Sequence, residues 1–183
     1  MQRLWGLALL PVLAPLGAQA ATIAELTGKT VVVPYKWTAT YSNNGNPLHA
    51  ICTGEENFYF SKEGRLFIYR TNIDCNDGTL GGQNDQGRVV TLQKGAQDAN
   101  KIQGVAATTT VKTLSKDKLE IAGKVRTQSG GGTTDYSLSI KLSVAGSCDL
   151  KDLIKIVVKI PNATESFSYD LVGRGCSIVD GKR

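Results

Sequence analysis

The stretch Phe58-Tyr59-Phe60-Ser61-Lys62-Glu63-Gly64-Arg65-Leu66-Phe67-Ile68-Tyr69 contains two apolar runs separated by a short polar turn. Ser61 suits the first position of a type I turn, and Gly64 suits the left-handed position that follows it. Aromatic and branched residues on both sides of such a turn are typical of a β-hairpin. The stretch therefore predicts a hairpin from which the neighbouring strands can be placed.

A register that pairs Phe60 with Leu66 gives this hairpin two different faces. Four apolar side chains share the first face, which we expect to be core: Phe58, Phe60, Leu66 and Ile68. The second face is amphipathic and carries Tyr59, Phe67 and Tyr69, with Arg65 at its border. Because tyrosine offers both a ring and a hydroxyl, this second face is the predicted surface for a ligand or partner. The alternative is that another part of the chain covers it.

Alternation of apolar and polar residues continues through the rest of the chain. The apolar positions are even-numbered across residues 136–144 and 154–160, and odd-numbered across residues 167–171. Period two with one polar face indicates antiparallel sheet, and no helical periodicity supplies crossover connections. We expect about nine or ten strands in one all-β domain, residues 21–183, arranged as an antiparallel meander. An up-and-down barrel would hide the sheet edges, and a two-sheet β-sandwich is the alternative.

Local residues predict where the pattern is irregular. Pro34 interrupts the strand at residues 30–41, so that half of the strand is expected to be an edge or a bulge. Residues 72–87 are rich in Asn, Asp and Gly and are expected to form a loop, as are residues 95–100.

Residues 1–20 have the features of a secretory signal peptide. Arg3 precedes an apolar run, and Ala18-Gln19-Ala20 supplies small residues before a cleavage site after Ala20. The alternative is an uncleaved membrane anchor. No later stretch is long and apolar enough to span a membrane, so we expect a periplasmic or secreted bacterial protein without a membrane span after cleavage.

Net charge after cleavage is small. Removing Arg3 leaves 20 basic against 16 acidic residues, a formal charge of +4. The basic residues are scattered along the sequence, whereas a nucleic-acid-binding domain usually shows a basic cluster, so we expect no nucleic-acid partner.

Four cysteines, Cys52, Cys75, Cys148 and Cys176, follow the leader. An even number in an exported chain predicts two disulfide bonds. The hairpin register brings Cys52 within one position of Cys75, and a bulge near Gly54 or Asp74 would align them. Cys148 then remains for Cys176. Zinc is the rival interpretation, but no two of these cysteines have the short spacing that zinc sites prefer.

Catalytic and metal-binding patterns are weak. His49 is the only histidine, and a secreted hydrolase would have to use it or carboxylates such as Glu55 and Glu56. Adjacent residues of a strand point to opposite faces, and a solvated turn is the simpler interpretation of these two glutamates. A calcium loop at residues 74–85 would have irregular ligand spacing. We therefore predict no catalytic residue, no metal site and no cofactor.

Four short motifs support a family resemblance: Leu26-Thr27-Gly28-Lys29-Thr30-Val31-Val32-Val33, Phe60-Ser61-x-x-Gly64-Arg65-x-Phe67, Ser147-Cys148, and Gly175-Cys176-Ser177-Ile178-Val179-Asp180-Gly181. With these motifs the chain resembles small exported hypothetical proteins of rhizobial soil bacteria. The resemblance implies a periplasmic or secreted product. It also implies that Cys148 and Cys176 belong together, and that Cys52 and Cys75 are an addition. It implies no activity.

These observations favour an exported, disulfide-stabilised, non-enzymatic binding or interaction protein. Its target would be a small apolar ligand in the mouth of the barrel, or a protein partner on the second face of the hairpin, which we call the Tyr59 face (Tyr59, Phe67 and Tyr69). The alternatives are the secreted hydrolase and a structural component of the cell envelope.

Overall fold

The computed structural model describes residues 22–43, 46–76, 87–102, 105–129, 131–146 and 148–183. Within these ranges the chain forms eleven β-strands and one short 3₁₀ helix, η1. In chain order they are η1 (Ile23–Leu26), β1 (Lys29–Asn43), β2 (Asn46–Phe60), β3 (Arg65–Cys75), β4 (Arg88–Thr91), β5 (Gln97–Ile102), β6 (Val105–Leu114), β7 (Lys118–Ser129), β8 (Gly132–Ser143), β9 (Asp149–Ile160), β10 (Ala163–Arg174) and β11 (Ser177–Asp180).

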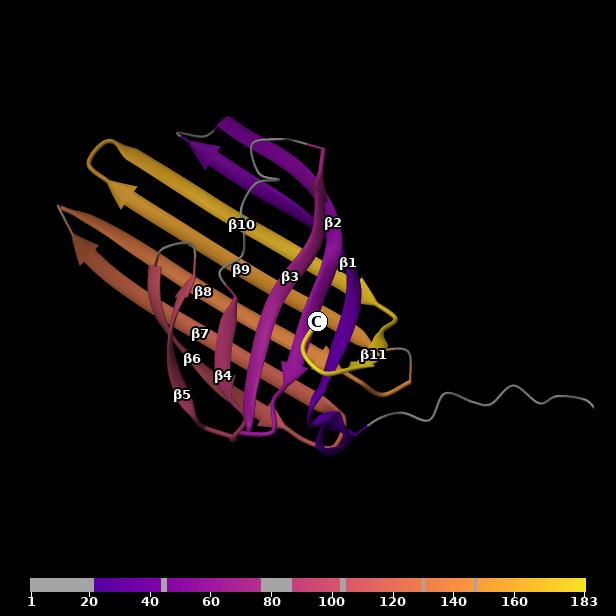
Figure 1. Cartoon of the computed structure of the whole chain (residues 1–183). Coiled ribbons are helices and arrows are strands. Elements are labelled where there is room, and N and C mark those ends of the chain that lie inside the picture. The colour runs from indigo at the N-terminus through magenta and orange to yellow at the C-terminus, as the bar shows by residue number, and fades with distance from the viewer. Residues whose placement is uncertain (1–21, 44–45, 77–86, 103–104, 130, 147) are drawn as a thin grey trace, which may run out of the picture.

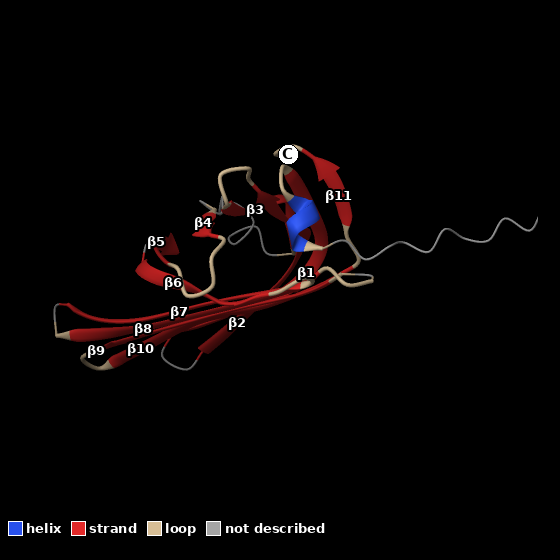
Figure 2. Cartoon of the chain, turned by 90° about the horizontal axis from the view of Figure 1, so that it is seen from below, coloured by secondary structure: helices blue, strands red, loops and turns tan. Residues whose placement is uncertain are grey.

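The strands form one antiparallel sheet that curls into a nearly closed up-and-down barrel, which confirms the predicted fold class. Their order is β4-β3-β2-β1-β10-β9-β8-β7-β6-β5, and β11 pairs with β1 beside this path. Figure 1 shows the shorter strands β3–β6 in front of the long strands β7–β10. Seen from below in Figure 2, β7–β10 form a flat layer, and β3–β6, η1 and β11 lie on one side of it. The first long strand of the chain, β1, pairs with the last, β10, so the sheet of the described residues is interrupted only between β4 and β5.

Side chains join the two edge strands, β4 and β5. Asp98 of β5 accepts hydrogen bonds from the Thr91 backbone N–H at 2.7 Å and from the Thr91 hydroxyl at 2.9 Å. Asn100 Oδ1 accepts a further bond from the Val89 N–H at 3.1 Å. These contacts satisfy backbone donors that an open sheet edge would expose to other chains.

The β2–β3 hairpin has the predicted register. Phe58 pairs with Ile68 and Phe60 pairs with Leu66, and all four side chains are buried in the core. Gly64 closes the turn with a φ of 72°, a left-handed conformation that glycine adopts without strain.

Both disulfides connect the predicted cysteines. The β2–β3 register shifts between Thr53 and Glu55, at the Gly54 bulge that the sequence suggested, and this shift places Cys52 opposite Cys75. The Cys52–Cys75 bond spans 23 residues of sequence, and the Cys148–Cys176 bond spans 28. The second bond ties the start of β9 to the segment that leads into β11.

Other local predictions need correction. The expectation of a loop at residues 95–100 is wrong, because β5 begins at Gln97, and the strands outnumber the nine or ten expected. Pro34 lies in an interior strand, not at an edge. It sits where β1 changes neighbour, between the β11 register, which ends at Val32, and the β10 register, which begins at Tyr35. The missing proline N–H thus falls where β1 changes partner.

Candidate functional site

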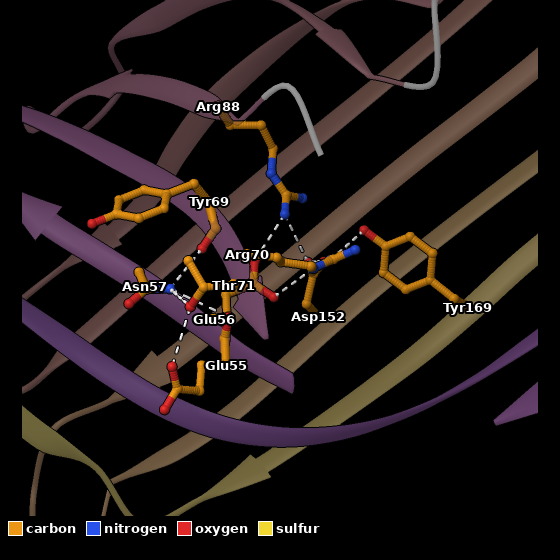
Figure 3. Close-up of polar contacts among 9 residues, drawn as sticks. All are labelled: Glu55, Glu56, Asn57, Tyr69, Arg70, Thr71, Arg88, Asp152 and Tyr169. Atoms are coloured by element: carbon orange, nitrogen blue, oxygen red, sulfur yellow. Dashed lines mark hydrogen bonds and ion pairs between the residues drawn. The ribbon is translucent and has the colours of Figure 1, made fainter. Parts of the chain in front are cut away.

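A cluster of four charged side chains crosses the interior of the barrel (Figure 3). We call it the charged cluster: Glu56 of β2, Arg70 of β3, Arg88 of β4 and Asp152 of β9. Arg70 contacts Glu56 at 3.1 Å and Asp152 at 3.0 Å. Arg88 contacts the same two carboxylates at 2.8 and 3.1 Å. Both carboxylate side chains have no exposed surface, so two positive and two negative charges compensate one another away from water.

The strand registers explain why these residues meet. Glu56 lies two positions from Phe58 on the inward side of β2, and it pairs directly with Arg70 on β3. Arg88 lies opposite Ile68 at the start of β4. Asp152 comes from the opposite wall, where β9 alternates buried and exposed residues. The cluster therefore links two walls that do not share backbone hydrogen bonds.

Aromatic rings surround the Arg70 guanidinium. It lies 4.6 Å from the ring centre of Tyr169, 5.3 Å from Trp37 and 5.8 Å from Tyr35. Arg70 also donates a hydrogen bond to the Tyr169 hydroxyl at 2.7 Å. Burial raises the pKa of the Tyr169 phenol, with a smaller contribution from the Asp152 carboxylate, so this hydroxyl stays protonated.

From the charged cluster, aromatic rings lead toward the end of the barrel opposite η1, which we call the far end. Trp37 stacks edge-on against Tyr169 at 4.9 Å, and Tyr169 stacks in the same way against Phe167 at 6.0 Å. Two polar atoms in this region are buried without a hydrogen-bond partner among the described residues, Trp37 Nε1 and Asp152 Oδ1.

Phe167 belongs to a row of inward-facing apolar side chains at the far end. Register neighbours on β1, β10, β9, β8 and β7 make up this far-end row: Tyr41, Phe167, Ile156, Tyr136 and Val125. Tyr136 is 1% exposed and Ile156 8%, whereas Phe167, Tyr41 and Val125 are only half-buried. Further along β9, on the same face, Ile160 is 46% exposed. Figures 1 and 2 show the ends of β7–β10 extending beyond the short strands β4–β6 at this end.

The predicted ligand or partner surface lies on the other side of the β2–β3 hairpin, away from this row. Tyr59 and Phe67 are half-buried, with ring centres 5.9 Å apart, and Arg65 is exposed and lies 3.8 Å from Asp98. These residues therefore share a face, as the register predicts.

Residues 182 and 183 lie against this surface. The Lys182 ammonium is 4.7 Å from the Phe67 ring centre and 5.7 Å from that of Tyr69. The Tyr69 hydroxyl donates a hydrogen bond to the Arg183 carbonyl at 2.9 Å, and the Arg183 guanidinium contacts Glu55 at 3.0 Å. The chain thus covers part of the face itself.

The residues considered for hydrolysis do not converge. His49 is exposed on β2, and its Nδ1 lies 3.2 Å from the Thr40 hydroxyl. Glu55 and Glu56 point to opposite faces, but the expectation of a solvated turn is wrong, because both lie within β2 and Glu56 is fully buried. No group of three or more potential metal ligands occurs among the described residues, and residues 77–85 of the calcium candidate lie outside them.

The charged cluster was not recognised in the sequence, although a signal for it exists. Asp152 has the same parity as Ile154 and Ile156, and Arg70 has the same parity as Leu66 and Ile68. A charged residue at an inward position of a strand needs a buried partner, and two strands with acids and two with arginines can supply each other. The alternation does not say which strands face each other across the interior.

No helix of the described residues is long and apolar enough to cross a membrane. The chain matches no protein-family model and no curated protein, so the geometry of these surfaces is the basis for any functional assignment.

Proposed function

We propose that this protein is an exported, non-enzymatic binding protein that takes a small apolar ligand against the far-end row. The observation that carries the proposal is the gradient of exposure along one inward face, from the buried Tyr136 through the half-buried Phe167 to the exposed Ile160. Ligand sites are concave and mostly apolar, with a few polar groups that fix orientation. The far-end row supplies the apolar part.

The charged cluster forms the polar inner end of such a site. Its charges compensate one another, so it does not attract a free ion, but the buried Trp37 N–H can donate a hydrogen bond and Asp152 Oδ1 can accept one. A ligand with an apolar body and one hydrogen-bonding end fits this order of surfaces.

Export is part of the same proposal. The leader-like residues 1–20, the resemblance to exported proteins of rhizobial soil bacteria and the two disulfides support a periplasmic or secreted location, because disulfides persist in oxidising compartments.

The proposal can be tested with the neutral fluorescent probe N-phenylnaphthylamine. Trp37 is the only tryptophan after residue 20, so energy transfer from Trp37 to the probe reports binding near the aromatic rings. We expect saturable transfer that Phe167→Ser abolishes and that Val172→Ser, on the outer face of the same strand, leaves unchanged. Absence of transfer, or an equal loss in both variants, would overturn the proposal.

A protein partner on the Tyr59 face is a second candidate, favoured by the contact with residues 182 and 183. A face that holds a lysine side chain and a backbone carbonyl of its own chain has the chemistry to hold a basic peptide. A labelled peptide of residues 177–183 should bind a chain that lacks residues 182 and 183, and Phe67→Ala in that chain should weaken it. Binding that is indifferent to Phe67→Ala would refute this candidate.

A further inference from the structure

The outer face of six adjacent strands gathers half of the basic residues that follow the leader. On β1, β10, β9, β8, β7 and β6 this outer face carries ten exposed cations: Lys36, Lys112, Lys118, Lys124, Arg126, Lys141, Lys151, Lys155, Lys159 and Arg174. Four acidic residues share it: Glu120, Asp135, Asp149 and Asp170. Of the 20 basic and 16 acidic residues after position 20, ten and twelve remain elsewhere. The basic residues are scattered in the sequence, but the order of the strands places half of them on one side of the sheet.

The stability of the sheet does not explain this arrangement. Lys36 pairs with Val172, Val172 with Lys151, and Lys151 directly with Lys141. Like charges opposite each other in a sheet are destabilising. Lys141 contacts Glu120 at 3.6 Å, with both side chains exposed to water, and such a pair stabilises a fold little.

Aliphatic side chains lie exposed among these lysines. Val172 is 47% exposed and Leu153 39%. Val172 sits between Lys36 and Lys151 in the register, and Leu153 lies between Lys151 and Lys155 along β9. Exposed apolar side chains within a basic surface indicate a contact with something both anionic and apolar.

The shape of the face selects among anionic partners. Figure 2 shows β7–β10, which carry eight of the ten cations, edge-on as a flat layer, and these four strands span about 14 Å. Its cations spread in two dimensions, whereas a single polymer chain is followed by cations in a line or groove. The described outer positions of these six strands carry no aromatic side chain on which a sugar or a base could stack.

We call this outer face of β1 and β6–β10 the lysine face. We propose that the lysine face docks on the surface of an anionic lipid bilayer, with its ammonium groups on the lipid phosphates and Leu153 and Val172 against the interfacial region. Each basic residue near such a surface strengthens binding about fivefold, and the effect weakens with salt. The proposal is independent of the far-end row, which lies on the inward side of the sheet.

The test uses protein expressed from the full sequence, sedimented with vesicles of phosphatidylcholine alone or with phosphatidylglycerol. We expect binding only to the anionic vesicles, with loss at high salt. The triple variant Lys36→Gln, Lys151→Gln and Lys155→Gln should bind roughly a hundredfold more weakly, at about fivefold per lysine. A matched control removes three exposed lysines at turns of the η1 end, Lys62, Lys94 and Lys116, and should bind as the unchanged protein does.

A second variant separates apolar contact from charge. Leu153→Ser with Val172→Ser should weaken binding to the anionic vesicles without changing the net charge, while circular dichroism shows the fold intact. The proposal is overturned if the anionic vesicles are not bound, or if both lysine triples lose affinity equally. It is also overturned if polygalacturonate or duplex DNA binds while vesicles do not, which would identify a polymer as the partner.

Discussion

Replacing Arg70 with methionine tests whether the charged cluster holds the two walls of the barrel together. The guanidinium lies within 3.1 Å of Glu56, 3.0 Å of Asp152 and 2.7 Å of the Tyr169 hydroxyl, and its side chain is 4% exposed. Methionine keeps the aliphatic bulk and removes the charge. Glu56 and Asp152 then share Arg88, and a balanced buried cluster becomes one with a net negative charge.

The expected loss is large, because removing one partner of a buried ion pair leaves a charge uncompensated. Such changes cost about 3–5 kcal/mol of unfolding free energy. At about 2–4 °C per kcal/mol for a chain of this size, the melting temperature should fall by roughly 6–20 °C. Urea unfolding followed by Trp37 fluorescence, with the disulfides intact, measures this loss.

Two comparisons make the Arg70→Met result specific. Arg126 also pairs with an aspartate, Asp135, at 3.1 Å, but the two side chains are 64% and 37% exposed, and Arg126→Met should cost less than about 1 kcal/mol. Adding Glu56→Gln to Arg70→Met restores charge balance, so the double variant should be more stable than the sum of the single losses by about 0.5–3 kcal/mol. Equal costs for the two arginine variants, or strict additivity, would show that the charged cluster does not hold the two walls together.

Three further variants test the barrel around this cluster. Asp98→Ala should cost about 1–3 kcal/mol in urea unfolding and speed hydrogen exchange at the Thr91 amide, because that donor loses its acceptor; unchanged exchange would contradict the side-chain closure of the barrel. Gly173→Ala should cost about 1–3 kcal/mol with an unchanged denaturant slope, since a Cβ there would lie 2.7 Å from Val33 Cγ1. Tyr169→Phe should remove a pH dependence. Because burial raises the pKa of Tyr169, only the unfolded state releases this proton above about pH 10, and stability falls there by about 1.4 kcal/mol per pH unit; an equally steep fall in Tyr169→Phe would exclude that cause.

The features that the sequence predicted correctly depend only on strands that follow one another along the chain. Alternation identified the antiparallel strands, and the turn at Gly64 set a register that placed Cys52 opposite Cys75 through a bulge at Gly54. Each of these features joins residues that are connected through one hairpin, so local geometry was sufficient.

The remaining features depend on strands that are distant in the sequence. The pairing of β1 with β10 joins the first and the last long strands of the chain, and no turn residue encodes it. Asp152 meets Arg88 across the interior, 64 positions apart, because the sheet curls. The lysine face arises in the same way, since period two fixes the side of each lysine but only the strand order makes them neighbours.

Quenching of Trp37 fluorescence by a brominated long-chain alcohol measures whether an apolar ligand binds against the far-end row. Bromine quenches tryptophan only at short range, and the stacked rings of Trp37, Tyr169 and Phe167 connect this tryptophan to the row. We predict saturable quenching that Phe167→Ser removes and that Val172→Ser preserves. Unquenched Trp37 fluorescence at saturating ligand, or quenching unaffected by Phe167→Ser, would show that no apolar ligand binds against the far-end row.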